Sequence, residues 1–390
     1  MERRTFLVGS ALAAPLAAQD TVRVGVIGAG GRGRYHIDQY KEVGAQVAAV
    51  CDIYEPNLKR GLAAANTGAA SFTDYRKLLE DKSLEAVVIA TPDHWHARMA
   101  IDAVEAGKDV YLEKPLAHTI DEGFKIVEAV RRTRRILQVG TQRRSAELFR
   151  EARQVAQPSE LGDIRLVTSM WLNNQASLTA KPIEGALDWK QWLGSAPNRP
   201  VDATRFFNWY YFWDYSGGLL VGQAAHIVDA IHWFMGSREP LAVTCTGGRT
   251  NLAGAEVPDT ACLVIEYPEN YLATFTLGYK AMHYNPFNDQ MVQFHGSKAR
   301  LDLGRESYAL FKESSAVELG PAVEKKQPGS FEPATRAHIR NFLECVRTRQ
   351  EPNAPVEAGQ ATNIVLCLAM ESMRTGKRLR WNVERRRVEG

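Results

Sequence analysis

The stretch Val22-Arg-Val-Gly-Val-Ile-Gly-Ala-Gly-Gly-Arg-Gly33 decides the fold of this chain. Its β-branched run, residues 22–27, is typical of a strand buried on both faces of a parallel sheet. Gly28, Gly30 and Gly33 follow in G-x-G-x-x-G spacing, and residues 35–43 are predicted to form a helix. The first glycine permits a tight turn, the second lets backbone approach a pyrophosphate, and the third allows close packing of helix on strand. The stretch therefore predicts a dinucleotide-binding turn with the phosphates at a helix N-terminus.

The residue expected to contact the adenosine ribose is Asp52. A second apolar run, residues 46–50, ends in Cys51-Asp52, which places this carboxylate 24 residues after Gly28. A carboxylate at that distance accepts hydrogen bonds from the ribose hydroxyls and repels a 2′-phosphate, so NAD is favoured over NADP. The alternative is an aspartate that ends a strand and caps the next helix.

Length and composition set broad limits. The chain has 390 residues, a formal net charge of +3 and 24% charged residues, which fits two domains or one large one. No basic stripe argues for a nucleic-acid partner. The five cysteines form no C-x-x-C pair, so small buried apolar residues are expected in place of a disulfide or zinc framework.

The N-terminus resembles an export signal. Arg3-Arg4 precedes an apolar, alanine-rich run that ends near Ala18, as in twin-arginine signals, so residues 1–20 are predicted to direct export to the periplasm. The apolar run is too short for a permanent membrane span. A disordered extension on a cytoplasmic protein is the alternative.

Two patterns of secondary structure divide the chain. Strands and helices alternate through residues 21–145, which predicts a doubly wound α/β domain that binds NAD. Residues 146–390 carry runs joined by short turns, which predict an open, mainly antiparallel sheet in a substrate-binding domain of α+β type. C-terminal helices are expected at 338–348 and 361–375 within this second domain.

Several motifs together resemble the Gfo/Idh/MocA oxidoreductase family. They are the glycine-rich turn, Thr91-Pro-Asp-His-Trp-His96, Glu113-Lys-Pro115, the helix entry from Gly217-Gly to His226, and Asn341-Phe-Leu-Glu-Cys-Val. The resemblance implies a Rossmann domain, a second α/β domain with an open sheet, and hydride exchange between a tightly bound nicotinamide and a sugar or polyol carbon. It also implies a homo-oligomer formed through the open sheet.

Lys114 is the expected proton acceptor. Oxidation of a secondary alcohol needs a group that takes the hydroxyl proton, and an amine beside a cationic nicotinamide has a lowered pKa. In the family, the lysine of Glu-Lys-Pro lies beside the nicotinamide, and the resemblance implies a cis Lys114–Pro115 bond. The alternative is an ordinary surface lysine at a strand end.

His226 is the second expected catalytic residue, and its surroundings depart from the family. Family members often carry Asp-x-x-x-His on one helix face, but Gly222 stands at the aspartate position here and Gln223 is the nearest polar neighbour. A buried structural role for His226 stays open. Asp229 and His232 follow His226 at three-residue steps, which point their side chains in different directions around the helix, so no metal site is expected.

The resemblance and the positions of strand ends give the remaining site residues. Aromatic side chains pack well against the C–H faces of sugar rings, so Trp209 and Tyr210 of the stretch 204–215 are predicted to contact the substrate. The alternative for this stretch is packing in the core or at an oligomer interface. His94 is alternatively a helix-start residue, and Gln142 and Arg143 are alternatively inter-domain contacts. The predicted cofactor contacts are Gly28, Gly30, Gly31, Arg32, Gly33, Asp52, Thr91, Pro92, His94, His96, Glu113, Lys114 and Gln142. The predicted substrate contacts are Arg143, Trp209, Tyr210, Gln223 and His226.

The sequence is compatible with three functions. The first is an exported NAD-dependent oxidoreductase acting on a sugar-like carbon. The second is an NAD-dependent glycosidase that oxidises its substrate transiently, eliminates the aglycone and reduces the product again; the glycine at position 222 keeps it open. The third is a non-catalytic sugar-binding or cofactor-binding protein, against which the intact Lys114 argues.

Overall fold

The computed structural model describes residues 21–173, 178–248, 252, 254–285, 287–313 and 320–389. The predicted export signal, residues 1–20, lies outside the described residues. Within the described ranges, no helix combines the length and apolar character that crossing a membrane requires.

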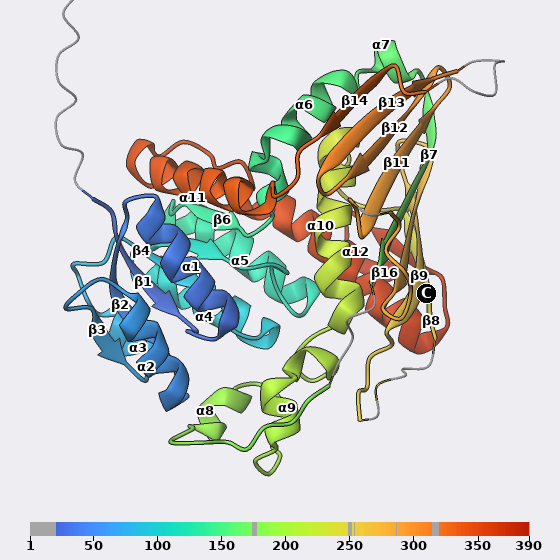
Figure 1. Cartoon of the computed structure of the whole chain (residues 1–390). Helices are drawn as coiled ribbons and strands as arrows, with labels where there is room; N and C mark the ends of the chain where they lie inside the picture. The colour runs from blue at the N-terminus through green and yellow to red at the C-terminus, as the bar shows by residue number, and fades with distance from the viewer. Residues whose placement is uncertain are drawn as a thin grey trace, which may run out of the picture.

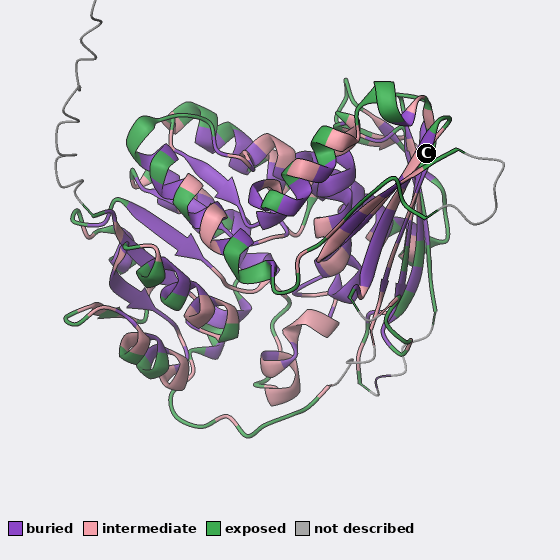
Figure 2. Ribbon diagram, turned by 45° about the horizontal axis from the view of Figure 1, so that its top comes forward, coloured by how far each residue is buried: buried purple, intermediate pink, exposed green. Residues whose placement is uncertain are grey.

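The N-terminal half folds around a parallel sheet of six strands in the order β3-β2-β1-β4-β5-β6 (Figure 1). Its strands are β1 (Arg23–Ile27), β2 (Gln46–Cys51), β3 (Ala70–Phe72), β4 (Ala86–Ile89), β5 (Asp109–Leu112) and β6 (Leu137–Val139). The helices between them are α1 (Gly31–Glu42), α2 (Glu55–Ala64), α3 (Tyr75–Leu79), α4 (His96–Glu105) and α5 (Ile120–Thr133). Five of these strands are largely buried and the edge strand β3 is partly exposed, whereas the outward sides of the helices are exposed (Figure 2). The predicted doubly wound fold is confirmed, and its strand order reverses between β1 and β4, where such sheets bind ligands.

Helix α1 begins earlier than predicted. The expected helix spans residues 35–43, but α1 starts at Gly31 and ends at Glu42. Two glycines in the first turn disfavour a helix by about 1 kcal/mol each, which is why the sequence pattern misses this turn. Gly33 is needed there because a Cβ at this position would overlap the carbonyl oxygen of Gly28.

The C-terminal half carries a ten-stranded sheet in the order β14-β13-β12-β11-β7-β10-β9-β8-β15-β16. Its strands are β7 (Ile164–Leu172), β8 (Ala242–Gly247), β9 (Thr260–Tyr267), β10 (Tyr271–Gly278), β11 (Gln290–Gly296), β12 (Ala299–Gly304), β13 (Ser307–Lys312), β14 (Val323–Lys326), β15 (Leu379–Asn382) and β16 (Arg387–Glu389). β7 and β10 pair in parallel, whereas the other neighbouring strands of this sheet pair antiparallel. The predicted mainly antiparallel sheet is confirmed.

Two long helices cover one face of this second sheet. They are α10 (Gly218–Met235) and α12 (Val356–Thr375), which pack on each other and on the sheet (Figure 1). α10 is almost wholly apolar on its buried sides, so it can lie between the sheet and the N-terminal half. Short helices α6 (Glu147–Val155) and α7 (Pro158–Leu161) lead into β7.

Helix α11 (Phe331–Thr348) packs on the N-terminal half, although it lies far along the chain. Its Phe342 ring lies 5.8 Å from the ring of Tyr111 in β5, and the Gln138 side chain of β6 donates to the carbonyl of His338 at 2.8 Å. The helix begins seven residues before the predicted start at residue 338. Pro333 in its first turn suggests a loop, but a proline is tolerated there because its missing N–H has no helical partner.

Residues 178–217 cross back to the N-terminal half and form a roof over one edge of the parallel sheet. They contain α8 (Trp189–Leu193), α9 (Ala203–Phe207) and the 3₁₀ turn η3 (Trp209–Tyr211). The N–H of Glu55 donates to the Ala186 carbonyl at 2.9 Å, and the indole of Trp95 donates to the Trp192 carbonyl at 2.8 Å. This segment, called the roof below, fixes residues of the second half beside the glycine-rich turn.

Candidate active site

The glycine-rich turn leaves backbone N–H groups facing open space. Gly28 has φ of +86°, and a Cβ there would lie 2.8 Å from the Ala90 carbonyl oxygen, so only glycine fits. At Gly31 a Cβ would meet nothing within 4 Å. α1 has no capping side chain at its N-terminus and no acidic residue in its first turn. These free N–H groups fit a pyrophosphate.

Asp52 lies at the end of β2 beside this turn. Its carboxylate accepts hydrogen bonds from the N–H groups of Ala29 at 2.7 Å and Tyr54 at 2.9 Å. Burial raises the pKa of Asp52 to about 6, and the two N–H donors oppose that rise. The carboxylate therefore braces the turn and stands where a ribose is expected.

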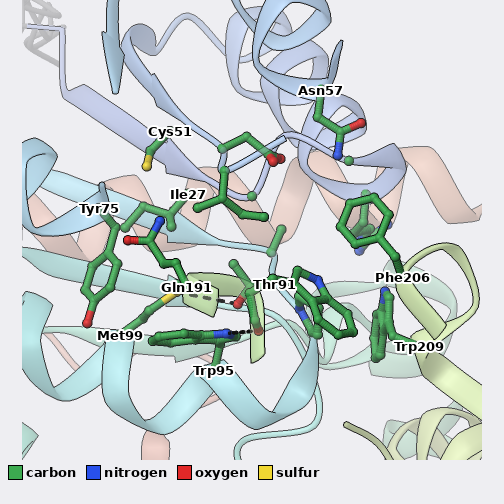
Figure 3. Close-up of a pocket in the computed structure, with 18 of the residues that line it drawn as sticks. Ile27, Cys51, Asn57, Tyr75, Thr91, Trp95, Met99, Gln191, Phe206 and Trp209 are labelled. Atoms are coloured by element: carbon green, nitrogen blue, oxygen red, sulfur yellow. Dashed lines mark hydrogen bonds between the residues drawn. The ribbon is translucent and has the colours of Figure 1, made fainter. Parts of the chain in front are cut away.

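A first cavity of about 290 Å³, the glycine-loop cavity, lies between the turn and the roof (Figure 3). It is lined by seven of the residues predicted to contact the cofactor, which are Gly28, Gly30, Gly31, Arg32, Asp52, Thr91 and Pro92. Its opposite wall comes partly from the roof, through Gln191, Trp192, Phe206, Phe207 and Trp209, of which Trp209 alone was predicted, as a substrate contact. Figure 3 shows Trp95 and Met99 beneath Thr91, and Phe206 and Trp209 facing the turn. An apolar wall opposite a phosphate-binding turn suits an adenine ring.

A second cavity of about 330 Å³, the lysine cavity, adjoins the first and shares Arg32, Thr91 and Trp209 with it. Lys114 lines it at the end of β5, after which the Lys114–Pro115 bond is cis. The ammonium of Lys114 donates to the Gly222 carbonyl of α10 at 3.0 Å. Burial lowers the pKa of Lys114, whereas Glu113 and Asp93 oppose that shift. The amine thus lies where the two halves of the chain meet.

Glu113 holds a charged network behind Lys114. Its buried carboxylate accepts from Arg32 Nε at 2.7 Å and lies 2.6 Å from His36 Nε2. Burial alone would raise the pKa of Glu113, but Arg32 and His36 hold it well below its usual range. Arg32 lines both cavities, so this network links the glycine-rich turn to the lysine.

Tyr210 fills the space that Gly222 leaves open. A Cβ at Gly222 would overlap the Tyr210 hydroxyl and lie 2.9 Å from its Cε2. The phenol lines the lysine cavity, and burial raises its pKa well above the ordinary value. A neutral hydroxyl therefore occupies the position from which the family's usual aspartate side chain would start.

His226 lies one helical turn further along α10 and also lines the lysine cavity. Burial, together with Lys114 and Arg143, holds its pKa well below the ordinary value, so the ring is neutral at pH 7. Its Nδ1 is buried and has no partner among the described residues. A neutral ring with a free nitrogen can exchange a hydrogen bond with a substrate hydroxyl.

Asp229 and His232 point to partners of their own. Both carboxylate oxygens of Asp229 lie 2.9 Å from Arg144 Nε, and His232 Nε2 lies 2.8 Å from the Tyr267 hydroxyl. In the part of the chain that the structure describes, no group of three His, Cys, Asp or Glu side chains could hold a metal ion.

Four predicted contacts, Gly33, His94, His96 and Gln223, line none of the cavities described here. His96 lies between the carbonyls of Pro115 at 2.7 Å and Thr91 at 3.1 Å, and His94 lies 3.1 Å from the Trp192 carbonyl. Gln223 donates to the Tyr279 hydroxyl. The two histidines therefore join the β4 loop to the cis bond and to the roof. Gly33 packs on the turn.

Asp93 and the roof residues Gln191, Trp192, Phe206 and Phe207 are the main lining residues that the sequence did not predict, whereas Trp209 and Tyr210 of the roof were predicted as substrate contacts. Asp93 is buried, accepts from the Ser216 hydroxyl at 2.6 Å and lines the lysine cavity. Burial raises its pKa. Its place within Thr91-Pro-Asp-His was a usable signal, because every residue there follows a parallel strand. The roof carried no comparable signal apart from its aromatic content.

Comparison with known proteins agrees with this geometry. Residues 22–141 match the model described as oxidoreductase family, NAD-binding Rossmann fold, and residues 192–381 match the C-terminal alpha/beta domain of the same family. Inositol 2-dehydrogenase 2 of Saccharopolyspora erythraea is 31% identical over 249 residues, which are 63% of each chain. The chain thus spans slightly less than two thirds of that relative.

Two further matches extend the comparison. An alpha-N-acetylgalactosaminidase of Shewanella oneidensis is 37% identical over 127 residues, 30% of this chain and 27% of that protein. The WlbA dehydrogenase of Bordetella pertussis, solved with NADH and UDP-GlcNAcA, has a TM-score of 0.71 at 21% identity, over 93% of this chain and 99% of that one. The chain belongs to the Gfo/Idh/MocA oxidoreductase family, and its N-terminal sheet is that family's NAD-binding Rossmann fold.

Proposed function

We propose that the protein is an NAD-dependent dehydrogenase that oxidises a secondary hydroxyl group of a sugar or polyol and keeps its cofactor tightly bound. The observation that carries the proposal is the position of Lys114, whose amine lies 3.0 Å from the Gly222 carbonyl in a cavity that adjoins the glycine-loop cavity. Residues 21–145 would bind NAD, and residues 146–390 would supply the substrate contacts and the roof. The names of the relatives, among them inositol 2-dehydrogenase 2, support the choice of substrate class.

In this proposal Lys114 takes the hydroxyl proton. NAD, when bound, supplies the hydride acceptor. Lys114 must first be neutral, and its lowered pKa increases the neutral fraction at a given pH. His226 orients the reacting hydroxyl through its free ring nitrogen. Glu113, paired with Arg32, accepts from the backbone N–H of Lys114 at 3.2 Å, and Trp209 lines both cavities.

Tyr210 is proposed to replace the missing carboxylate. An aspartate at position 222 would accept a hydrogen bond from substrate in its charged form, whereas a neutral phenol can donate or accept. The position of the Tyr210 hydroxyl over Gly222 supports the replacement of the aspartate carboxylate by the phenol. The chain would then retain a polar group opposite Lys114 without a second negative charge.

The test is a single-turnover assay on purified protein. The nucleotide released by denaturation is identified, and sugars and polyols are then screened for reduction of bound NAD. Lys114→Ala should slow reduction about 100- to 10,000-fold while NAD affinity changes by a small factor. A Lys114→Ala protein that reduces NAD at the wild-type rate would remove Lys114 from the mechanism.

The glycosidase alternative shares the first oxidation step with the dehydrogenase. The match to an alpha-N-acetylgalactosaminidase favours including it in the assay, although it covers 27% of that protein. Aryl glycosides therefore belong in the same screen. Aglycone release without net NADH would identify the glycosidase, whereas net NADH identifies the dehydrogenase. Binding of sugars with neither outcome would indicate a non-catalytic protein.

We also propose a homo-oligomer formed through the uncovered face of the ten-stranded sheet. Along β9 and β10 the residues alternate between buried and exposed, and the exposed set includes Leu272 at 44%. Apolar side chains on an open sheet face favour association. Sedimentation of wild type and Leu272→Lys tests this, because only an oligomer through that face should dissociate.

Export by the twin-arginine route is proposed from Arg3-Arg4 and the apolar run that follows. That route carries folded proteins, so NAD would be loaded before export, and tight retention would suit a periplasm that offers no free cofactor.

A further inference from the structure

A third cavity, called the arginine cavity, continues from the lysine cavity toward the ten-stranded sheet. It shares Gln142, His226 and Phe331 with the lysine cavity, and its own lining includes the cations Arg143 and Arg305 and the ring of Trp171. Its volume is about 50 Å³. A single water needs roughly 10–15 Å³ by this measure, so the space suits a group of a few heavy atoms and is too small for a sugar ring.

Arg143 is a buried cation without an anionic partner. It is 9% exposed, and its guanidinium carbon lies 5.4 Å from the Phe149 ring centre and 5.6 Å from that of Trp171. Its hydrogen bond to the His226 carbonyl is long, at 3.5 Å. Among the described residues no carboxylate lies within ion-pair distance of it. A guanidinium has five N–H donors, and burying them unpaired is costly.

The neighbouring arginines show how the chain satisfies such a group elsewhere. Arg144 lies 2.9 Å from both carboxylate oxygens of Asp229, and Arg32 lies 2.7 Å from Glu113. Both pairs join elements that are distant in sequence. Arg143, which borders His226, is the exception at this site.

The charges around the arginine cavity do not cancel. Arg305 lies over the same Trp171 ring, at 5.4 Å, and its one carboxylate partner is Asp289 at 2.8 Å. Asp289 and Asp229 both act on Arg143, but Asp229 is balanced by Arg144. With His226 neutral, Arg143, Arg305 and Asp289 leave one positive charge. Burial and the nearby Arg305 lower the pKa of Arg143 to about 9, which still leaves it protonated at neutral pH.

Two amide oxygens in the same cavity also have no donor. The Oε1 atoms of Gln142 and Gln290 are buried and unpartnered within the described part of the chain. Amide oxygens accept hydrogen bonds from hydroxyl groups, whereas guanidinium groups donate to carboxylates. The cavity therefore offers donors for one anion and acceptors for adjacent hydroxyls.

We propose that the arginine cavity binds the carboxylate of a sugar acid, a uronate or an aldonate, while a hydroxyl of the same molecule lies at Lys114. The proposal rests on the proposed oxidation at Lys114 and names its substrate class. One carboxylate matches the single unbalanced charge, whereas a phosphate monoester would bring about −1.5 to −2. The hydroxyl next to the carboxylate would donate to Gln142 or Gln290.

The test compares acids with their neutral counterparts on the NADH-loaded protein. Calorimetry or saturation-transfer NMR measures the affinities of D-glucuronate, D-galacturonate and D-gluconate beside D-glucose, D-galactose and sorbitol. At least one acid should bind about 10- to 100-fold more tightly than its neutral partner, as expected for charge-assisted hydrogen bonds. Arg143→Gln should abolish the difference and Arg143→Lys should keep part of it. Arg98→Gln, an exposed ion-pair residue of α4, is the matched control and should change nothing.

A second variant and a salt series keep the test decisive if Arg143→Gln does not fold. Arg305→Gln should weaken acid binding, and rising NaCl should weaken acids while leaving neutral sugars unaffected. Equal affinity for acids and neutral sugars, or a preference that survives both substitutions, overturns the proposal. Tighter binding of glucose 6-phosphate than of any carboxylate also overturns it.

Reduction of bound NAD is recorded separately, so the two proposals fail independently. If acids bind through Arg143 and no acid or neutral sugar forms NADH, the dehydrogenase is refuted and the anion site stands. NADH formed from neutral sugars without any acid preference would support the dehydrogenase and refute the anion site.

Discussion

Substitution of Gly222 by alanine tests whether Tyr210 occupies the space of the missing aspartate. In an exposed or loosely packed helix this change stabilises by about 1 kcal/mol, because glycine is a poor helix former. Here the new Cβ would overlap the Tyr210 hydroxyl and lie 2.9 Å from Cε2. Overpacking of this kind costs about 1–3 kcal/mol. Gly222→Ala is therefore expected to lower the free energy of unfolding of the wild-type protein by roughly 0–2 kcal/mol.

A double-mutant cycle separates the two contributions. In a Tyr210→Ala background the overlap is gone, so Gly222→Ala should recover its helix contribution and stabilise by about 1 kcal/mol. The coupling energy between the two positions is then about 1–3 kcal/mol. Urea unfolding measures each corner of the cycle, and the same variants should differ by roughly 2 °C in melting temperature for each kcal/mol.

Activity gives a second readout of the same perturbation. Displacing the phenol should slow the oxidation step, whereas NAD affinity should stay the same because Tyr210 lines the lysine cavity and not the glycine-loop cavity. The pair Gly222→Asp with Tyr210→Ala rebuilds the family's usual arrangement and should recover more turnover than Tyr210→Ala alone. If Gly222→Ala stabilises the wild-type protein by a full 1 kcal/mol and leaves turnover intact, the space is empty and the reasoning fails.

Three further changes test other parts of the site. The pKa of Asp52 is about 6, and its carboxylate is the form that accepts ribose hydrogen bonds, so NAD affinity should rise up to about tenfold from pH 5 to pH 7. Asp52→Asn should flatten this pH profile and reduce the ratio of NAD affinity to NADP affinity. A flat wild-type profile in titration calorimetry would contradict the assignment of Asp52 to the ribose. Glu113→Gln should lower the free energy of unfolding at neutral pH by about 1–3 kcal/mol, less than for a fully buried pair because the Arg32 side chain that loses its partner is 32% exposed. The folded pKa of Glu113 is depressed, so its contribution is present above the ordinary value near 4.5 and is lost as pH falls through the folded value. The urea midpoints of the two proteins should therefore converge in acid. Replacing Arg3 and Arg4 by lysine should leave a folded, NAD-binding protein in the cytoplasm, and identical fractionation of both forms would refute the export signal.

The glycine-rich turn, Asp52 and the strand ends were predictable because each follows from local spacing. A tight turn after a buried strand fixes its own geometry, and Thr91 and Lys114 follow strands that end at the same edge of a parallel sheet. Such residues need no knowledge of distant contacts.

The remaining features depend on packing that a linear pattern does not contain. The absence of an aspartate at position 222 is visible in the sequence, but its replacement by the Tyr210 hydroxyl requires the fold of η3 against α10. His96 matches a motif, yet two backbone carbonyls surround its ring. The unpaired state of Arg143 becomes apparent only once Arg144 and Arg305 are seen with their carboxylates.

The docking of α11 on the N-terminal half has a consequence for synthesis of the chain. Ile339 and Phe342 are fully buried in the same core as Val24 and Tyr111, and His338 contacts the Val139 carbonyl across 199 residues of sequence. On a ribosome that adds 5–20 residues per second, that core stays open for roughly 10 to 40 s after β6 has emerged. The nascent N-terminal half exposes apolar surface during that interval, so it is a target for chaperones, and a fragment ending near residue 145 should aggregate. The N-terminal half would then bind nucleotide with its full affinity only after the whole polypeptide has been synthesised.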